Sequence, residues 1–338
     1  MANPIALQVK DLKTYFYNDQ RCNKAVNGVS FEIEKGKTLC IVGESGCGKS
    51  VTASTIMQLL PTLSRIEEGE INYFAGDGEN APAIRIDQLE RNGAEMRRIR
   101  GSEIAMIFQD PMTALNPAYT IGFQIGETLQ YHTSLGKKEI RQKTIQLLAD
   151  MGIPLPERRV DEYPHQYSGG MRQRAMIAMA MACQPKILIA DEPTTALDVT
   201  IQAQIFELMD DLKKSNNTAI LLITHDMGVV AELADSVAVM YMGNIVEAGT
   251  VEEVLGQPRH PYTRALLQSI PVLGKGRNQR IAAIRGSTPD AYDRPVGCQF
   301  EPRCDFASPD CSSMPDEQNL SDTHRLRCWH PQRDSGSE

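Results

Sequence analysis

The sequence lacks a long apolar run of the kind that crosses a membrane. The longest apolar stretch near an expected helix, Ala175 to Cys183, has nine residues and ends at Gln184-Pro185-Lys186, whereas a membrane-spanning helix needs about 20. The first residues, Met1 to Pro4, also lack a basic segment followed by an apolar run, so no signal peptide is expected. These absences predict a cytoplasmic protein, or one bound to a membrane through other proteins.

The sequence also lacks an excess of basic residues. It has 35 Lys and Arg against 43 Asp and Glu, a net charge of −8, so no basic footprint for nucleic acid is present. No internal repeat is found. With 338 residues, 41% of them hydrophobic and 23% charged, the composition is that of a globular protein with room for more than one domain.

One motif carries most of the functional information. Gly43 to Ser50 reads Gly-Glu-Ser-Gly-Cys-Gly-Lys-Ser and fits the phosphate-binding pattern G-x-x-x-x-G-K-[ST], between an expected strand at 38–42 and a helix that starts at Val51. The glycines allow backbone N–H groups to surround phosphate oxygens, and the positive end of the helix adds to the attraction. Lys49 is expected to reach the β- and γ-phosphates, and the Ser50 hydroxyl to hold magnesium. The motif predicts binding of a nucleoside triphosphate.

Short apolar runs alternate with helical patterns along most of the chain, which predicts an α/β fold with a mostly parallel sheet. Between residues 111 and 166 the pattern is helical only, so an inserted helical subdomain is expected there. After about residue 250 the sequence becomes rich in Pro, Gly and Arg and then poor in aliphatic residues, which places a domain boundary near 250–255. Strands are expected at 5–9, 29–33, 38–42, 104–108, 187–190, 219–224, 236–241 and 244–247, and helices at 51–60, 121–132, 138–151, 171–183 and 201–214.

Two further motifs suit phosphate chemistry. An apolar strand ends in Asp191-Glu192, where Asp191 can hold the magnesium shell and Glu192 can deprotonate the attacking water. Tyr167-Ser168-Gly169-Gly170-Met171 precedes a strong helix and offers a second anion site. Taken alone, the second motif is better explained as an ordinary helix N-cap at Ser168.

Together and in this order, the three motifs resemble those of ATP-binding subunits of ABC transporters over residues 1 to about 250. Further positions resemble motifs of that family: Gln109 the glutamine of the Q-loop, Asp198 the D-loop and His225 the switch histidine. The Ser-Gly-Gly loop departs from the family at its flanks, Tyr167 and Met171. Cys47 within the phosphate loop predicts that ATPase activity is sensitive to thiol reagents.

The resemblance implies a set of functional residues. An aromatic residue on the first strand would stack on adenine, and spacing favours Phe16 over Tyr15. Catalytic roles are implied for Glu192, His225 and Gln109. The Ser168-Gly169-Gly170 loop would face the ATP of a partner cassette, with Asp198 in the D-loop. The residues implied in binding ATP and magnesium are Phe16, Gly43, Glu44, Ser45, Gly46, Cys47, Gly48, Lys49, Ser50, Val51, Gln109 and Asp191.

The resemblance extends to the ATPases of bacterial dipeptide and oligopeptide importers, and is closest to the D-type subunit of dipeptide importers. It rests on the segment from Gln109 to Pro117, on residues 191–200, and on His260-Pro261-Tyr262-Thr263 followed by Ala265-Leu266-Leu267 and Ile270-Pro271. It implies an ABC-type P-loop ATPase with a mixed sheet core, an inserted helical subdomain at about 111–166 and a small irregular C-terminal extension. The nucleotide-binding domain would span residues 1–250 and the extension 251–338.

The same resemblance implies the partners and the location. A second, related ATPase would form a heterodimer with this chain, two permease subunits would span the membrane, and an extracytoplasmic protein would deliver peptide. No nucleic-acid partner is implied, and the chain would lie on the cytoplasmic face of the bacterial inner membrane as a peripheral protein. Nickel or antimicrobial-peptide uptake, and a soluble ABC ATPase without a transport role, are the alternatives.

Four cysteines gather in the tail: Cys298, Cys304, Cys311 and Cys328. Four thiols in a segment with little apolar core suggest a staple. Disulfides do not suit the cytosol, and the close cysteine pairs of zinc sites are absent, although zinc and unligated thiols stay open. Because the resembled importer group carries a [4Fe–4S] cluster on such a tail, the resemblance favours these four cysteines as cluster ligands.

Overall fold

The structure is a computed structural model that describes residues 4–18, 21–76, 82–194, 197, 199–269 and 284–332. The chain divides into two compact units. The first unit comprises Met1–Leu7, Ile33–Thr38 and Asn72–Ile223, and the second comprises Gln8–Glu32, Leu39–Ile71 and Thr224–Glu338.

The first unit is built on parallel strands in the order β8-β7-β6. They are β6 (Ile104–Ile107), β7 (Ile187–Asp191) and β8 (Ala219–Thr224). Ile107 pairs with Ala190, and Asp191 pairs with Ile223, so the carboxyl ends of the strands lie at one edge. All residues of β7 and β8 are buried, which explains why they read as continuous apolar runs.

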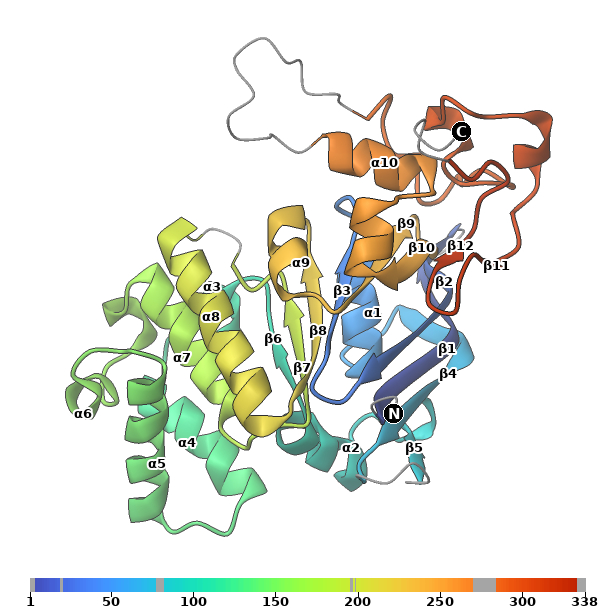
Figure 1. The fold of residues 1–338 in the computed structure, drawn as a ribbon. Helices are drawn as coiled ribbons and strands as arrows, with labels where there is room; N and C mark the ends of the chain where they lie inside the picture. The colour runs from blue at the N-terminus through green and yellow to red at the C-terminus, as the bar shows by residue number, and fades with distance from the viewer. Residues whose placement is uncertain are drawn as a thin grey trace. The chain divides into compact units, whose positions relative to one another are not determined.

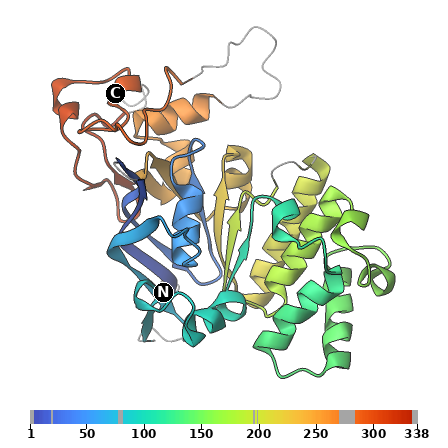
Figure 2. The same ribbon diagram turned by 180° about the vertical axis from the view of Figure 1, so that it is seen from behind.

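Helices fill the chain between β6 and β7, as the sequence predicts. They are α3 (Pro111–Ala114), α4 (Ile121–His132), α5 (Lys137–Asp150), α6 (Pro156–Arg159), η3 (Pro164–Gln166) and α7 (Gly169–Met181). Helix α4 begins after Thr120, whose hydroxyl accepts from the Phe123 N–H at 3.2 Å, as expected of an N-cap. Helices α4, α5 and α7 pack on one another, and α7 also packs on β6 (Figures 1 and 2). Helix α8 (Val199–Asn216) precedes β8.

The second unit holds most of two sheets. One has the strand order β2-β1-β4, with β1 (Ile5–Asn18), β2 (Arg21–Glu34) and β4 (Ser64–Phe74). The other has the order β11-β12-β10-β9-β3. Its members are β3 (Thr38–Val42), β9 (Ser236–Tyr241), β10 (Asn244–Thr250), β11 (Gln318–Asn319) and β12 (Arg325–Leu326). β3 pairs parallel with β9, and β9 pairs antiparallel with β10, so the predicted α/β fold with a mixed sheet is confirmed.

Shorter elements complete both units. In the first, β5 (Ala83–Arg85) pairs with the end of β4 and is followed by η1 (Ile86–Gln88), α2 (Ala94–Arg98) and η2 (Ile99–Glu103). In the second are α1 (Lys49–Ile56), α9 (Met227–Leu233), η4 (Glu252–Gly256), α10 (Pro261–Gln268), η5 (Glu301–Arg303) and η6 (Pro309–Ser312).

Strand β4 was not predicted from the sequence. Its first half, Ser-Arg-Ile-Glu-Glu-Gly-Glu, is mostly charged and partly or fully exposed, and only Ile71, Asn72 and Tyr73 near its end are buried. An apolar alternation long enough to indicate a strand is therefore missing.

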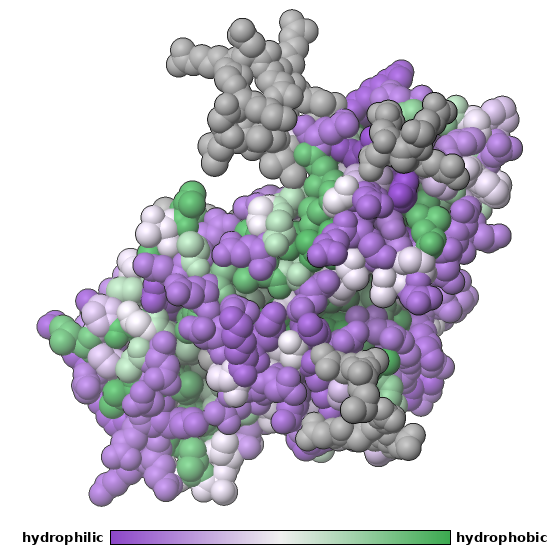
Figure 3. Space-filling model, viewed as in Figure 1, coloured by the Kyte–Doolittle hydropathy of each residue, from purple (hydrophilic) through white to green (hydrophobic). Residues whose placement is uncertain are grey.

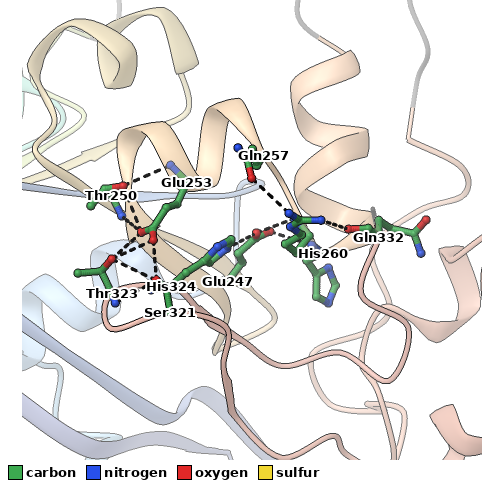
Figure 4. Close-up of polar contacts among 10 residues, drawn as sticks. Glu247, Thr250, Glu253, Gln257, His260, Ser321, Thr323, His324 and Gln332 are labelled. Atoms are coloured by element: carbon green, nitrogen blue, oxygen red, sulfur yellow. Dashed lines mark hydrogen bonds and ion pairs between the residues drawn. The ribbon is translucent and has the colours of Figure 1, made fainter. Parts of the chain in front are cut away.

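The C-terminal extension is mostly irregular but is tied to the sheet by β12, which pairs antiparallel with β10 through Glu247 and Leu326. Glu247 is fully buried. Its carboxylate accepts from the backbone N–H groups of Arg259 at 2.7 Å and His260 at 2.9 Å, and lies 2.8 Å from Nε2 of His324 (Figure 4). We refer to these four residues as the Glu247 network.

A second carboxylate supports the same attachment. Glu253 accepts from Ser321 and Thr323 of the extension and from Thr250 (Figure 4). Burial opposes ionisation of this carboxyl, but the bonds from Ser321, Thr250 and Thr323 outweigh it and lower its pKa to about 2.

None of the helices in the described ranges is both long and apolar enough to cross a membrane. On the face drawn in Figure 3, hydrophilic residues predominate and hydrophobic ones form small groups.

We expect Glu247→Ala to lower the free energy of unfolding of the extension by about 3 kcal/mol, because it leaves the buried N–H of His260 and the partly buried N–H of Arg259 without an acceptor and His324 without its partner. Trp329, the one tryptophan of the sequence, lies in the extension, so its fluorescence during urea unfolding is the measurement. Glu252→Ala, at an exposed neighbouring position, is the matched control. Equal urea midpoints for the two variants would contradict the structural role of Glu247.

Candidate functional site

The phosphate loop joins β3 to α1 in the second unit. Gly48 has φ = 109°, and a Cβ there would lie 2.2 Å from the carbonyl oxygen of Ala25. Gly43 has φ = 153°, and a Cβ there would lie 2.2 Å from the carbonyl oxygen of Met240. Both positions therefore require glycine for space as well as for conformation. The loop is fixed by backbone packing, as a site that closely surrounds phosphate needs.

Lys49 is buried, with 5% of its surface exposed. Its ammonium group donates to the carbonyl oxygens of Gly43 at 2.8 Å and Glu44 at 3.0 Å, so it lies over the loop. Ser45, Gly46 and Ser50 are exposed. A charged amine held above a loop with an exposed tip, at the start of a helix, fits a phosphate ligand.

Cys47 lies on the inner side of the loop and is 3% exposed. Burial raises the pKa of its thiol, whereas a reactive cysteine needs exposure and a lowered pKa. Its carbonyl oxygen accepts from the Gly243 N–H at 2.7 Å, so its contribution is made through the backbone. The structure therefore weighs against the expected sensitivity to thiol reagents.

The two aromatic candidates for adenine are neighbours on β1 and so point to opposite faces of the strand. Both are partly buried. The Tyr15 hydroxyl donates to Asn27 Oδ1 at 2.8 Å, and the ammonium of Lys24 lies 5.6 Å from the centre of its ring. Only one of the two rings can therefore stack on the adenine, and Phe16 stays the predicted residue. Val51 is the third residue of α1 and is partly buried.

The first unit brings together three of the predicted residues. Gln109 follows β6 by two residues, Asp191 ends β7, and Glu192 comes next. Because the carboxyl ends of parallel strands meet at one edge, their side chains come close, and Gln109 Nε2 donates to Glu192 Oε2 at 2.8 Å. Asp191 is buried.

Glu192 has an unusual backbone conformation. Its φ is 46°, which costs a residue other than glycine roughly 1 kcal/mol or more. Its N–H donates to the Ile223 carbonyl oxygen at 2.9 Å, and this bond supports the conformation. Strain held in place at a strand end is a frequent feature of functional sites.

The Ser-Gly-Gly loop stands at the start of α7. Ser168 is the N-cap, with its hydroxyl accepting from the Met171 N–H at 3.3 Å, and Ser168 and Gly169 are exposed. Tyr167, at a position that departs from the family pattern, is buried and donates its hydroxyl to the Arg159 carbonyl oxygen at 2.8 Å. The exposed loop backbone is thus unaffected by the departure. Both interpretations of Ser168, as N-cap and as anion site, are compatible with this geometry.

Gln173 was missed by the sequence analysis. It lies on α7, is 1% exposed and donates to the carbonyl oxygen of Pro193, the residue after Glu192. It joins the helix that begins at the Ser-Gly-Gly loop to the segment that holds the candidate base. Nothing in the local sequence marks it, because Gln173 lies between Arg172 and Arg174, ahead of the apolar run of α7, and its partner depends on the fold.

Other predicted residues belong to the second unit or fall outside the described residues. His225 follows β8 directly and is exposed, in the second unit. Asp198, and the Ile270-Pro271 pair of the C-terminal signature, lie outside the described residues.

The predicted metal site in the tail was wrong. Cys298, Cys304, Cys311 and Cys328 are all described, and all are free thiols. In the described part of the chain, no group of three or more His, Cys, Asp or Glu side chains is arranged to hold a metal ion. Burial raises the pKa of Cys298, Cys304 and Cys328. Neither the [4Fe–4S] cluster nor the zinc alternative is supported.

Comparisons with known proteins agree with the motifs. Residues 26–195 match the family model described as ABC transporter, and residues 246–311 match the oligopeptide/dipeptide transporter C-terminal region. The chain therefore belongs to the ABC transporter family. Its C-terminal part places it with those members that carry the oligopeptide/dipeptide transporter region, and the resemblance drawn from the motifs is confirmed.

Individual relatives cover nearly the whole chain. The oligopeptide transport ATP-binding protein OppD of Bacillus subtilis is 50% identical over 96% of this chain and 89% of its own length. The dipeptide transport ATP-binding protein DppD of Escherichia coli is 46% identical over 98% of each. These relatives are ATP-binding proteins of the usual ABC type, and nothing in the comparisons supports the expected heterodimer with a second, related ATPase.

A solved structure shares the cassette fold. The ATP-binding cassette MJ0796, in a dimeric post-hydrolysis state bound to ADP and Pi, has a TM-score of 0.63 and 26% identity. The similarity covers 72% of this chain and 98% of that one.

We expect Gly48→Ala to abolish nucleotide binding, because the added Cβ meets a backbone oxygen that cannot move away. Binding of a fluorescent ATP derivative to the full chain is the measurement. Gly28→Ala is the matched control, since Gly28 also has a positive φ of 84° but open space around it. Retained binding by Gly48→Ala, with Gly28→Ala unchanged, would show that the loop does not form the site.

Proposed function

We propose that this chain is the ATP-hydrolysing subunit of a bacterial importer of dipeptides or oligopeptides. The observation that carries the proposal is the extent of similarity: peptide-transport ATP-binding proteins 45–50% identical match 96–98% of the chain, including the C-terminal extension. A soluble ATPase of another role would share the cassette without the extension.

The phosphate loop would bind the triphosphate of ATP. The N–H groups at the exposed tip of the loop would donate to phosphate oxygens, and Lys49 would exchange its bonds to loop carbonyls for the β- and γ-phosphates. Phe16 would stack on adenine. Magnesium, held by Ser50 and Asp191, would neutralise the charge that develops during phosphoryl transfer.

Glu192 would act as the general base toward water. Gln109 donates to this carboxylate, so it holds the base in one orientation and can pass changes at the site to the helices that follow it. His225, which follows β8 directly, would take the catalytic role of the switch histidine. These residues position water and charge, which is most of what phosphoryl transfer requires of a protein.

The Ser168-Gly169-Gly170 loop, whose first two residues are exposed, would serve a second ATP-binding cassette, where it would face the phosphates of the ATP held by that cassette, and Asp198 would act as the D-loop residue. In functional terms, residues 1–250 would form the nucleotide-binding domain, 111–166 the helical subdomain that contacts membrane permeases, and 251–338 the extension. The chain would then sit on the cytoplasmic face of the membrane as a peripheral subunit with two permeases, and an extracytoplasmic binding protein would supply peptide.

Peptide uptake tests the proposal directly. A strain without this gene is expected to lose ATP-dependent uptake of a radiolabelled dipeptide or oligopeptide, and the wild-type gene is expected to restore it. Uptake that stays at the parental level for peptides of both lengths would contradict the peptide role.

Glu192→Gln is expected to leave ATP binding unchanged and to lower turnover at least about 100-fold, because an amide cannot accept the proton of the attacking water. Hydrolysis by the assembled transporter and binding by the full chain are measured in parallel. Glu157→Gln, at an exposed site on α6, is the control. Turnover near the wild-type rate would remove Glu192 from the base role.

A further inference from the structure

Glu44 is the second residue of the phosphate loop, and the C-terminal extension holds both its backbone and its side chain. Its N–H donates to the Tyr262 hydroxyl at 2.9 Å. Its carboxylate accepts from Arg303 through two bonds, Nη1 to Oε2 at 2.6 Å and Nη2 to Oε1 at 3.0 Å, and from the Thr288 hydroxyl at 3.3 Å. All of these residues lie in the second unit. A loop residue is thus fixed by groups more than 200 positions away.

Arg303 is held in place by further groups, among them the hydroxyls of Tyr241 and Thr288, to which its Nη1 also donates at 3.3 and 3.4 Å. Its side chain is 4% exposed, its Nε donates to the Arg285 carbonyl oxygen at 2.9 Å, and its guanidinium lies 5.9 Å from the ring centres of Tyr241 and Phe300. The guanidinium of the pair is buried and the carboxylate partly exposed, and a bidentate guanidinium–carboxylate pair is among the strongest and most directional polar contacts in proteins.

The part of the extension that carries these groups is packed. The ring of Tyr262 lies 4.6 Å from that of Tyr241 and 5.3 Å from that of Phe300, measured between centres. Tyr262 stands in the first turn of α10, and the N-cap of that helix, His260, donates its N–H to Glu247. The Glu247 network therefore fixes the start of α10, and α10 fixes the hydroxyl that accepts from Glu44.

A second arginine of the extension reaches the other side of the loop. Arg294 donates to the carbonyl oxygens of Lys24 and Met242. Met242 precedes Gly243, whose N–H donates to the Cys47 carbonyl oxygen at 2.7 Å. The extension thus supports the phosphate loop directly at Glu44 and, through one turn, at Cys47.

We propose that Arg303 is a positioning residue for nucleotide binding: by holding Glu44, it presets the phosphate loop, so that the C-terminal extension contributes to ATP affinity. The inference rests on the proposed function in that ATP is the ligand. Ser45 and Gly46 at the tip of the loop are exposed, and Glu44 beside them is the residue that the extension holds. A contact that holds the loop in its binding conformation before ATP arrives lowers the ordering cost of binding and so strengthens it.

A double-mutant cycle on the full chain tests this inference. The dissociation constant of N-methylanthraniloyl-ATP is measured for the wild type, Arg303→Met, Glu44→Gln and the double variant. Each single change is expected to weaken binding about tenfold, and the double variant no more than either, since both remove one charge-assisted contact. Arg303→Lys, which keeps the charge but not the two parallel bonds, is expected to fall between the wild type and Arg303→Met.

Arg285→Met is the matched control. Arg285 is in the same extension, its side chain is 75% exposed, and its ion-pair partner Asp305 lies 3.6 Å away. The Arg285→Met variant is therefore expected to bind the probe with wild-type affinity. Steady-state kinetics of the assembled transporter give a second test. In Arg303→Met the KM for ATP is expected to rise while kcat stays within about twofold of the wild type.

The outcomes separate positioning from stability. Trp329 fluorescence reports whether the extension is folded in each variant. Wild-type affinity in a folded Arg303→Met would overturn the inference and leave the proposed function standing. Where Arg303→Met does not fold, Glu44→Gln decides, because the Glu44 side chain is partly exposed and Gln has nearly the same size and can still accept a hydrogen bond. A wild-type chain that does not bind the probe would overturn both.

Discussion

The backbone of the phosphate loop packs directly against two neighbouring strands, and the phosphate site of the second unit depends on this close approach. Gly43 lies against β9 and Gly48 against β2, with no room for a side chain at either position. β9, β2 and the turn at Met242-Gly243 surround the loop and fix the path of its backbone. The phosphate site is therefore a property of the assembled sheet, although the residues that would touch phosphate are contiguous in sequence.

In the first unit the corresponding constraint is the parallel register of β6 and β7. Because Ile107 is level with Ala190, the residues that follow the two strands emerge together, and an amide and a carboxylate more than 80 positions apart form a hydrogen bond. Glu192 then adopts a left-handed backbone that turns the chain away from β7. The bond from Gln173 to Pro193 holds the chain after this turn, which couples α7 to the same edge.

The sequence was informative where one local pattern decides the structure. Apolar runs such as Ile187–Ala190 and Ala219–Thr224 can only be buried strands in this context, and the glycines at 43–48 define their own loop. It was uninformative for β4, where charged residues hide the alternation, and for Gln173, whose partner depends on the fold. The predicted site residues Gln109, Asp191 and Glu192 came together because strand order places them, and no sequence spacing encodes that order.

The four tail cysteines gave the opposite kind of error: the sequence pattern predicted a metal site that the structure does not support. Four thiols in an aliphatic-poor segment implied a metal staple. The extension is instead held by the buried carboxylate of Glu247, by the ring cluster of Tyr241, Tyr262 and Phe300, and by β12 added to the sheet. Composition counts aliphatic residues and so undervalues rings and buried ion pairs. Tyr262 belongs to this ring cluster and also accepts a hydrogen bond from the N–H of Glu44. The interactions that anchor the extension are therefore also the ones through which it contacts the phosphate loop.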